Sequence, residues 1–485
     1  MTVRLYQNMM GLLSMNRLPF AVPALLLMAI GCARLVQTEY RKPALQVPGR
    51  WAEGGGSESA PTLDQTAWWK AFADPVLDGL MDQALKGSLD LRQAQARIVQ
   101  ARAELTTAKA AQAPTVTASA SATRGQTSQN SLSAYPYPYT QYQAGFDAAW
   151  EFVQVGGLAK GREKAQALYE ASLEDLNATR LTLLGDVARY YITLRSCQAQ
   201  LEITRGNAEV QGRSADLTEQ RYEAGLVGRL DAAQARTQAA QTRAQIPVQQ
   251  ALVQQAIHRL GILLGQTPEA LEGGLSTAKP LPRCPAAGAA GLPAELLARR
   301  PDLRRKERQL AAAMADVGVA RADLYPTFDL TLGLGLESLG SSHFARRSSR
   351  YWDIVPGLSL PVFTRGRLKA AVTRKQAVYD EQLAGFQAAY HGALEDVENA
   401  LSSCYTDRAR RQDLEEALEE SRLAADLAEQ RYRQGLTGFL DVLSAQSARY
   451  TAESALSQSR ADLLTDYVSL YKSLGGGWNT GPGPD

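Results

Sequence analysis

The sequence predicts an α+β membrane protein whose protomer is one structural unit written twice. The first observation is a repeat, because Leu217–Arg236 and Leu427–Gln446 are identical at eleven of twenty positions. The second is a proline-free stretch from Leu158 to Tyr222, which would form a helix of roughly 100 Å at 1.5 Å per residue. The third is a set of segments, each about ten residues long, in which apolar and polar residues alternate as in a β-strand.

Composition excludes several classes of protein. The chain of 485 residues has 52 basic and 50 acidic residues, so no basic surface for nucleic acid is expected. Its three histidines stand apart from one another and from the four cysteines, which argues against a metal site or a general base. After the first 35 residues no apolar run reaches 18, which excludes a helical membrane protein. We therefore predict no catalytic residues, no metal site, no cofactor and no enzyme activity.

The N-terminus has the form of a signal peptide. A basic start is followed by an apolar stretch at 18–30 that is too short to span a bilayer, and translation could equally begin at Met15. The following Ala29-Ile30-Gly31-Cys32 resembles a bacterial lipobox, with residues 1–31 removed. Such a site implies diacylglycerol on the thiol of Cys32 and an acyl chain on its new amino group. A plain secretory signal with an incidental cysteine is the alternative.

The chain then divides into two similar units. We expect an acylated segment at 32–67, a first repeat at 68–262, a linker at 263–292, a second repeat at 293–475 and a tail at 476–485. Each repeat contains two strands followed by a helical hairpin. In the first repeat the strands lie at about 115–153 and the hairpin at about 157–262. In the second repeat they lie at about 327–363 and 367–472. The linker, which we also call the equatorial segment, is rich in proline, glycine and alanine.

The strands carry one apolar and one polar face. In the second repeat, Phe328, Leu330, Leu332, Leu334 and Leu336 alternate with Asp329, Thr331, Gly333, Gly335 and Glu337. This length and period are typical of a transmembrane β-strand, although a soluble two-faced sheet remains the alternative. Four strands are too few to close a barrel, and an open edge in lipid leaves unpaired backbone groups. We therefore expect several copies to share one barrel: two give eight strands, and three give twelve and a water-filled bore.

Four stretches resemble the TolC-like outer-membrane efflux channels, specifically the lipoprotein branch that serves multidrug and metal pumps. They are "WWKAFADPVLDGLMDQAL" at 68–85, "GLPAELLARRPDLRRKE" at 291–307, the paired "RYxxGLxGxLD" turns and "LYKSLGGGW" at 470–478. The resemblance implies a homotrimer with a 12-stranded β-barrel in the outer membrane of a Gram-negative bacterium and an α-helical barrel in the periplasm. It also implies a periplasmic adaptor protein and an inner-membrane pump of the resistance-nodulation-division (RND) kind as partners.

The paired turns would be the tips of the two helical hairpins. In each, glycine would supply the positive φ that a tight reversal demands and let another chain approach closely. By resemblance, adaptor hairpins would dock around these tips. The expected contact residues are Arg221, Tyr222, Gly225 and Gly228 in the first repeat, and Arg431, Tyr432, Gly435 and Gly438 in the second.

The same turns would hold the periplasmic gate. By resemblance, Leu440 belongs to an apolar ring that narrows the resting mouth, and Leu230 is its counterpart in the first repeat. Asp231 and Asp441 suit the first turn of the returning helices, where the helix dipole favours negative charge. Where close relatives carry an acidic ring, this chain has Ser444. We expect Asp441 to lie on a different helix face and not to replace that ring.

The leading function is a passive exit duct for drugs or other small toxic compounds. Alternatives with the same fold are an exit duct for a type I secretion, ABC-type or heavy-metal exporter. A structural coiled-coil or adhesin-like protein would explain the helices but not the alternating strands. The substrate is not specified by the sequence, although Asp147, Glu151, Asp329 and Glu337 suggest a mild preference for cations in the barrel.

Overall fold

The computed structural model describes residues 39–45, 48–49, 51–52, 67–128, 130, 138–153, 156–285 and 299–476. The predicted signal peptide, Cys32, Trp478 and most of the proposed tail lie outside these residues, as does part of the linker. The chain divides into two compact units. Unit 1 comprises residues 1–43, 98–172 and 306–386, and unit 2 comprises residues 44–97, 173–305 and 387–485.

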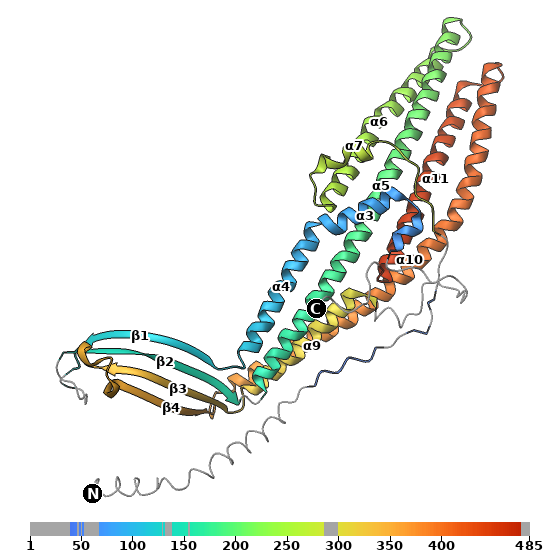
Figure 1. Ribbon diagram of the computed structural model, residues 1–485. Helices are drawn as coiled ribbons and strands as arrows, with labels where there is room; N and C mark the ends of the chain where they lie inside the picture. Colours follow the sequence, from blue (N-terminus) through green and yellow to red (C-terminus); the bar gives the residue numbers. More distant parts are fainter. Residues whose placement is uncertain are drawn as a thin grey trace. The chain divides into compact units, whose positions relative to one another are not determined.

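Unit 1 contains a four-stranded antiparallel sheet (Figure 1). Its strands are β1 (Thr115–Gly125), β2 (Tyr139–Val153), β3 (Thr327–Ser338) and β4 (Arg350–Ser359), paired in the order β1-β2-β3-β4. All four predicted strands are therefore confirmed. The connection from β3 to β4 contains two short 3-10 turns, η4 (Ser341–His343) and η5 (Arg347–Ser349). Within one chain, β1 and β4 are the two edges of the sheet.

The two faces of the sheet differ as the alternation predicts. Phe146, Leu334 and Trp352 stand opposite one another on β2, β3 and β4, with exposed fractions of 55%, 59% and 76%. One position along, the register pairs Asp147 with Gly333 and Gly333 with Asp353. A Cβ at Gly333 would lie 2.3 Å from Oδ1 of Asp353, so the aspartate side chain lies across the glycine. The apolar face is thus exposed and the opposite face carries carboxylates.

Helices complete unit 1. They are parts of α4 (Leu89–Ala110), α5 (Gly157–Glu223), α9 (Pro301–Ala322) and α10 (Arg367–Arg433). Asp316 of α9 joins two of the others, because it forms ion pairs with Lys164 of α5, at 2.8 Å, and with Lys375 of α10. Near the N-terminus of the described chain, the Tyr40 hydroxyl donates to Glu307 over 2.7 Å.

Unit 2 is helical throughout its described secondary structure. Besides parts of α4, α5, α9 and α10, it contains η2 (Trp68–Phe72), α3 (Pro75–Gly87), α6 (Arg229–Leu263), η3 (Pro268–Leu271), α7 (Glu272–Leu275) and α11 (Phe439–Ser473). The duplication is visible in the lengths, since α5 and α10 have 67 residues each and α6 and α11 have 35 each. The predicted long helical hairpins are confirmed. Among the described helices, none combines the length and apolarity needed to cross a membrane.

The opening signature motif lies in the core of unit 2. Trp68 is 1% exposed and stacks on Tyr471 of α11 with ring centroids 5.2 Å apart. Asp74 is the N-cap of α3, where its side chain accepts hydrogen bonds from the amides of Val76 and Leu77. The Tyr191 hydroxyl of α5 donates to the same carboxylate over 2.6 Å. This motif therefore attaches α3 to helices of both repeats.

The second signature motif meets the end of α11. Arg300 donates to Asp302 over 2.8 Å and to Asp396 of α10 over 2.9 Å. Gly475, which ends α11, has φ +76°, and a Cβ there would lie 3.0 Å from the backbone carbonyl of Arg299. The arginine-rich motif and the glycine motif are thus adjacent, and both have a structural role in joining the start of the second repeat to its end.

Candidate functional site: the hairpin tips

Each hairpin reverses through the same backbone structure. In the first, the amide of Gly225 donates to the carbonyl of Tyr222 and that of Leu226 to Arg221, over 2.9 and 2.8 Å. In the second, the corresponding bonds from Gly435 and Leu436 are both 2.9 Å. This double closure is a Schellman motif, which requires a left-handed residue after the helix. Gly225 and Gly435 supply it, with φ of +73° and +77°.

The second glycine of each tip has a different role from the first. Gly228 and Gly438 are the N-caps of α6 and α11, with φ of −79° and −80°. Neither needs positive φ, and no atom lies within 4 Å of a Cβ built on Gly438. In each tip the expected left-handed glycine is therefore the first of the two, Gly225 or Gly435. Asp231 and Asp441 lie in the first turns of α6 and α11, as expected.

An arginine of the first tip reaches the second tip. The Arg221 guanidinium donates to the carbonyl of Tyr432 over 2.6 Å and, at 3.4 Å, to that of Arg433. It also lies 4.7 Å from the centre of the Tyr432 ring. These carbonyls are at the C-terminus of α10, where the helix dipole attracts a cation. Arg221 therefore caps a helix of the other hairpin, a role that the sequence analysis had not assigned to it.

Aromatic packing supports this contact. Tyr432 is 3% exposed, and its ring meets that of Phe439 edge to face with centroids 5.7 Å apart. The Tyr432 hydroxyl donates to Oγ1 of Thr218 on α5 over 3.4 Å. Sequence reasoning missed Phe439. The signal was available, since the first repeat has Arg229 at the corresponding position, and an aromatic residue in place of an arginine indicates a buried face.

The leucines of both tips are exposed within the chain. Leu230 and Leu440 have exposed fractions of 69% and 64%, and Leu226 and Leu436 are similar. Tyr222 and Arg431 are also exposed. Covering an exposed leucine with another apolar surface removes apolar area from water and is favourable. The tips therefore carry four leucines that are exposed within the single chain.

One expectation about the acidic ring was wrong. Asp441 and Ser444 are both exposed on α11, and side chains three residues apart on a helix are neighbours. Asp441 therefore lies beside Ser444 on the helix surface, and beside Leu440 in sequence. A carboxylate is present next to the position where an acidic ring is expected.

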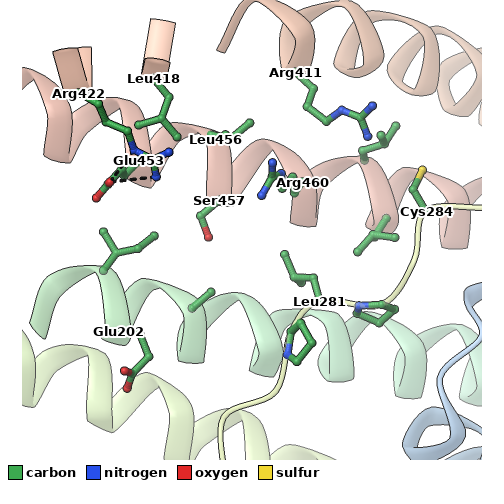
Figure 2. Close-up of a pocket in the computed structure, with 16 residues that line it drawn as sticks. Glu202, Leu281, Cys284, Arg411, Leu418, Arg422, Glu453, Leu456, Ser457 and Arg460 are labelled. Atoms are coloured by element: carbon green, nitrogen blue, oxygen red, sulfur yellow. Dashed lines mark hydrogen bonds and ion pairs between the residues drawn. The ribbon is translucent and has the colours of Figure 1, made fainter. Parts of the chain in front are cut away.

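A groove runs along the hairpins within unit 2. One cavity of this groove has a volume of about 590 Å³ and is lined by α5, α10, α11 and the segment 280–284 (Figure 2). A second cavity of about 450 Å³ shares Glu202, Ile203 and Glu453 with the first. Arg422 donates to Glu453 over 3.3 Å, and Figure 2 shows this pair on the same side of the cavity as Leu456. No sequence pattern indicated this groove.

Comparisons with known proteins agree with this architecture. The family model of the outer membrane efflux proteins matches residues 80–266 and 292–476. The pyoverdine export outer membrane protein OpmQ of Pseudomonas putida is 36% identical over 440 residues, covering 89% of this chain and 92% of OpmQ. The solvent efflux pump outer membrane protein SrpC of Pseudomonas putida is 31% identical over 463 residues, covering 94% of this chain and 97% of SrpC.

Solved structures give the same result. The outer-membrane channel OprN superposes with a TM-score of 0.86 at 36% identity, covering 91% of this chain and 98% of OprN. The outer membrane protein VceC of Vibrio cholerae superposes with a TM-score of 0.80 at 27% identity, covering 86% of this chain. The duplicated fold, the matched family model and these relatives lead to one conclusion. The chain belongs to the outer membrane efflux protein family, with the TolC-like fold, and is the outer-membrane channel component of a tripartite efflux system.

Proposed function

We propose that three copies of the chain assemble into one exit duct, in which twelve strands close a barrel in the outer membrane. The observation that carries this proposal is the open sheet of unit 1. Its apolar face is exposed, with Trp352 at 76%, and β1 and β4 have no partner strand within the described chain. In lipid, each unpaired backbone group costs several kcal/mol, so β1 of one copy pairs with β4 of the next.

Cross-linking between strands tests this assembly. Ser119→Cys in β1 is combined in turn with Asp353→Cys or Val355→Cys in β4, which lie on the same face of the sheet by register. Oxidation in outer membranes should give covalent dimers and trimers for at least one pair, because neighbouring copies contribute one strand each. The single Ser119→Cys variant is the control and should stay monomeric on a denaturing gel. Monomers from every pair would contradict the shared barrel.

The partners follow from the hairpin tips. We infer that the exposed turns dock a periplasmic adaptor, which connects the channel to an inner-membrane RND pump. Leu226 and Leu436 project from the turns with exposed fractions of 66% and 64% and would be covered by the adaptor. Replacing both by serine should abolish co-purification of the adaptor while leaving channel assembly unchanged. The Val248→Ser variant is a matched control, since Val248 is 51% exposed but lies 20 residues into α6.

The cargo is a small organic compound. This part of the proposal rests on relatives across most of the chain, whose names concern export of pyoverdine and efflux of solvents, toluene and antibiotics. Deleting the gene should lower resistance to organic solvents and hydrophobic antibiotics in its host. Unchanged resistance to them, together with sensitivity to metal ions, would favour the heavy-metal alternative.

Leu440 is the proposed gate. It is 64% exposed near the start of α11, and equivalent leucines of three copies would meet at the mouth. Leu440→Gly should raise the conductance of the purified channel in planar bilayers and increase antibiotic influx in cells without the pump. Leu230→Gly is the comparison variant. A smaller rise in conductance for Leu230→Gly than for Leu440→Gly would assign the constriction to the second tip. Unchanged conductance in Leu440→Gly would exclude Leu440 from the gate.

Lipid anchoring at Cys32 is the last part of the proposal. The support is the Ala29-Ile30-Gly31-Cys32 motif, and the residue lies outside the described part of the chain. Mass spectrometry of the N-terminal peptide should show a diacylglycerol and an acyl chain. In Cys32→Ala these groups should be lost. An unmodified Cys32 in wild-type protein would favour the plain secretory signal.

A further inference from the structure

A small apolar hollow lies in unit 1 where the helices meet the sheet. It has a volume of about 250 Å³ and is lined by the end of α4, the start of α5, the end of α9 and the start of β3. Asp323 is the one charged residue among the described residues that line it, and most of the others are small, among them Ala108, Ala111, Gly157, Gly161 and Ala322. An apolar cavity of about 150 Å³ already binds benzene. The hollow therefore has the size and chemistry to take a section of an acyl chain.

Tyr40 fixes the N-terminal part of the chain on the same helices. Its ring packs against a cluster of buried alanines that includes Ala167 of α5 and Ala311 of α9. Its hydroxyl donates to Glu307 of α9 over 2.7 Å, and the Arg308 guanidinium lies 6.0 Å from the centre of its ring. Tyr40 is thus held by a hydrogen bond and by packing on two helices that also line the hollow.

The two helices give the same distance from Tyr40 to the hollow. On α9, Ala312 packs in the Tyr40 cluster and Val319 lines the hollow, and these residues are about 10 Å apart at 1.5 Å per residue. On α5, Ala167 of the cluster and Gly161 of the hollow are about 9 Å apart by the same measure. The hollow therefore lies two helical turns from Tyr40, toward the sheet.

The lipid anchor proposed above has the length and the location to use this hollow. Cys32 is eight positions before Tyr40, so it lies within roughly 29 Å of that residue even if the chain between them is fully extended. The hollow adjoins Thr327, where β3 begins, and is therefore at the helical end of the sheet. In the proposed duct this end of the sheet lies at the periplasmic leaflet of the outer membrane. The acyl chains of Cys32 would enter the same leaflet.

We propose that the hollow holds part of an acyl chain of Cys32, and that Tyr40 positions the segment that leads to it. This inference rests on the proposed lipid anchoring at Cys32. A methylene chain in the hollow covers its apolar lining, which is favourable. Glycine and alanine in the lining leave room for the chain, since their side chains occupy little of the space between the helices. The anchor would thereby attach the N-terminus to the junction of α5, α9 and β3 as well as to the bilayer.

Photo-cross-linking tests the proposal. The host is grown with a palmitic acid that carries a diazirine near the end of its chain, and outer membranes containing the full-length protein are irradiated. Peptide mass spectrometry should find Cys32 joined through its acyl chain to residues 157–161 or 319–327. Cross-links from Cys32 to phospholipid alone, or a phospholipid in place of Cys32 on the hollow, would overturn the proposal. Protein without any fatty acid on Cys32 would overturn lipid anchoring as well, so the two failures are distinguishable.

Filling the hollow should remove the cross-link. No atom lies within 4 Å of a Cβ built on Gly161, and leucine favours a helix more than glycine does, so Gly161→Leu should fold. This variant should keep the fatty acid on Cys32 and lose the cross-link to the hollow. Gly212→Leu is the matched control and should keep the cross-link, because Gly212 lies on the same helix and a Cβ there is equally free.

A second variant tests the role of Tyr40. Tyr40→Ala removes both the ring and the hydroxyl, so it should lower the yield of the cross-link while leaving the fatty acid on Cys32. Tyr40→Phe keeps the ring on its alanine cluster and should recover part of that yield. A cross-link of wild-type yield in both Gly161→Leu and Tyr40→Ala would overturn the proposal.

Discussion

The two hairpin tips share a backbone but differ in their surroundings. Both turn through a left-handed glycine with the same pair of hydrogen bonds. Yet Tyr222 of the first tip is 38% exposed, whereas its counterpart Tyr432 is 3% exposed. The exposed Arg229 of the first tip corresponds to Phe439 in the second, which is 2% exposed. The duplicated residues thus specify the turn, and the differing residues specify which tip is packed against the other.

The same division holds along the whole chain. The structure has six glycines with positive φ among its described residues, and they form three pairs separated by 210 residues. The pairs are Gly156 and Gly366, Gly225 and Gly435, and Gly265 and Gly475. The first pair precedes the long helices α5 and α10, the second lies in the hairpin turns, and the third follows the returning helices α6 and α11. The two repeats therefore share their backbone geometry at these positions, and differences between equivalent side chains indicate where the repeats pack differently.

The largest test of this asymmetry compares the two tyrosines. Tyr432→Ala removes a buried ring that contacts Phe439 and Arg221, so it should destabilise the second tip by about 3 to 5 kcal/mol. Tyr222→Ala should cost less than about 1 kcal/mol because that side chain is partly exposed. Hydrogen exchange of the amides at 428–442 measures the opening free energy. Equal effects of the two substitutions would show that the tips are not distinct in packing.

The next test concerns the two arginines. Arg221→Ala removes a cation from the C-terminal carbonyls of α10 and should cost about 1.5 to 3 kcal/mol in opening of the tips. Arg431 is exposed, and Arg431→Ala should change the opening free energy by less than about 0.5 kcal/mol. Arg221→Lys should recover only part of the loss, because an ammonium group lacks the planar fork of donors. Full recovery with lysine would show that charge alone is needed.

A smaller effect is expected at the glycines. Gly435→Ala forces an alanine to φ +77°, which costs about 1 to 2 kcal/mol even though no atom lies near the new Cβ except a nitrogen of Arg221 at 3.7 Å. Gly438→Ala should cost about 0.5 kcal/mol, because its φ of −80° suits any residue and only the poorer N-cap preference of alanine remains. Thermal unfolding followed by circular dichroism compares the two variants. Similar melting temperatures would contradict the distinct roles given to the two glycines.

Much of the fold could be predicted from periodicity, because the relevant physics is local. Alternation of polarity defines β1 to β4, and the absence of proline allows α5 its 67 residues. Contacts between helices depend on which faces meet, and one sequence does not contain that information. Arg221 could be recognised as a tip residue, but its acceptors are 211 and 212 positions away. The groove beside Leu281 likewise arises only when the inter-repeat segment crosses α10 and α11.

The smallest effect concerns a carboxyl group that only the second repeat carries. Burial and the neighbouring Asp407 raise the pKa of Asp466 from 3.8 to about 7, and Asp462 adds to the shift. The equivalent position of the first repeat is Ala256, which is buried. Arg410 lies 3.8 Å from Asp407 and 3.9 Å from Asp462, so it only partly offsets this cluster of acids. The pKa of Asp466 is higher in the folded state than in the unfolded state. Folding therefore takes up a proton at pH values between 3.8 and about 7.

Stability from this group is therefore fully present below about pH 4 and is lost as the pH rises through about 7. Asp466→Asn keeps the shape without the charge, so it should melt above the wild type at pH 8. The difference should shrink as the pH falls to about 5, where the wild-type carboxyl is protonated in the folded state. The Asp466 side chain is half-buried, so the gain should be modest. A pH-independent difference would show that Asp466 keeps its charge, and that the two repeats do not differ in proton binding at this position.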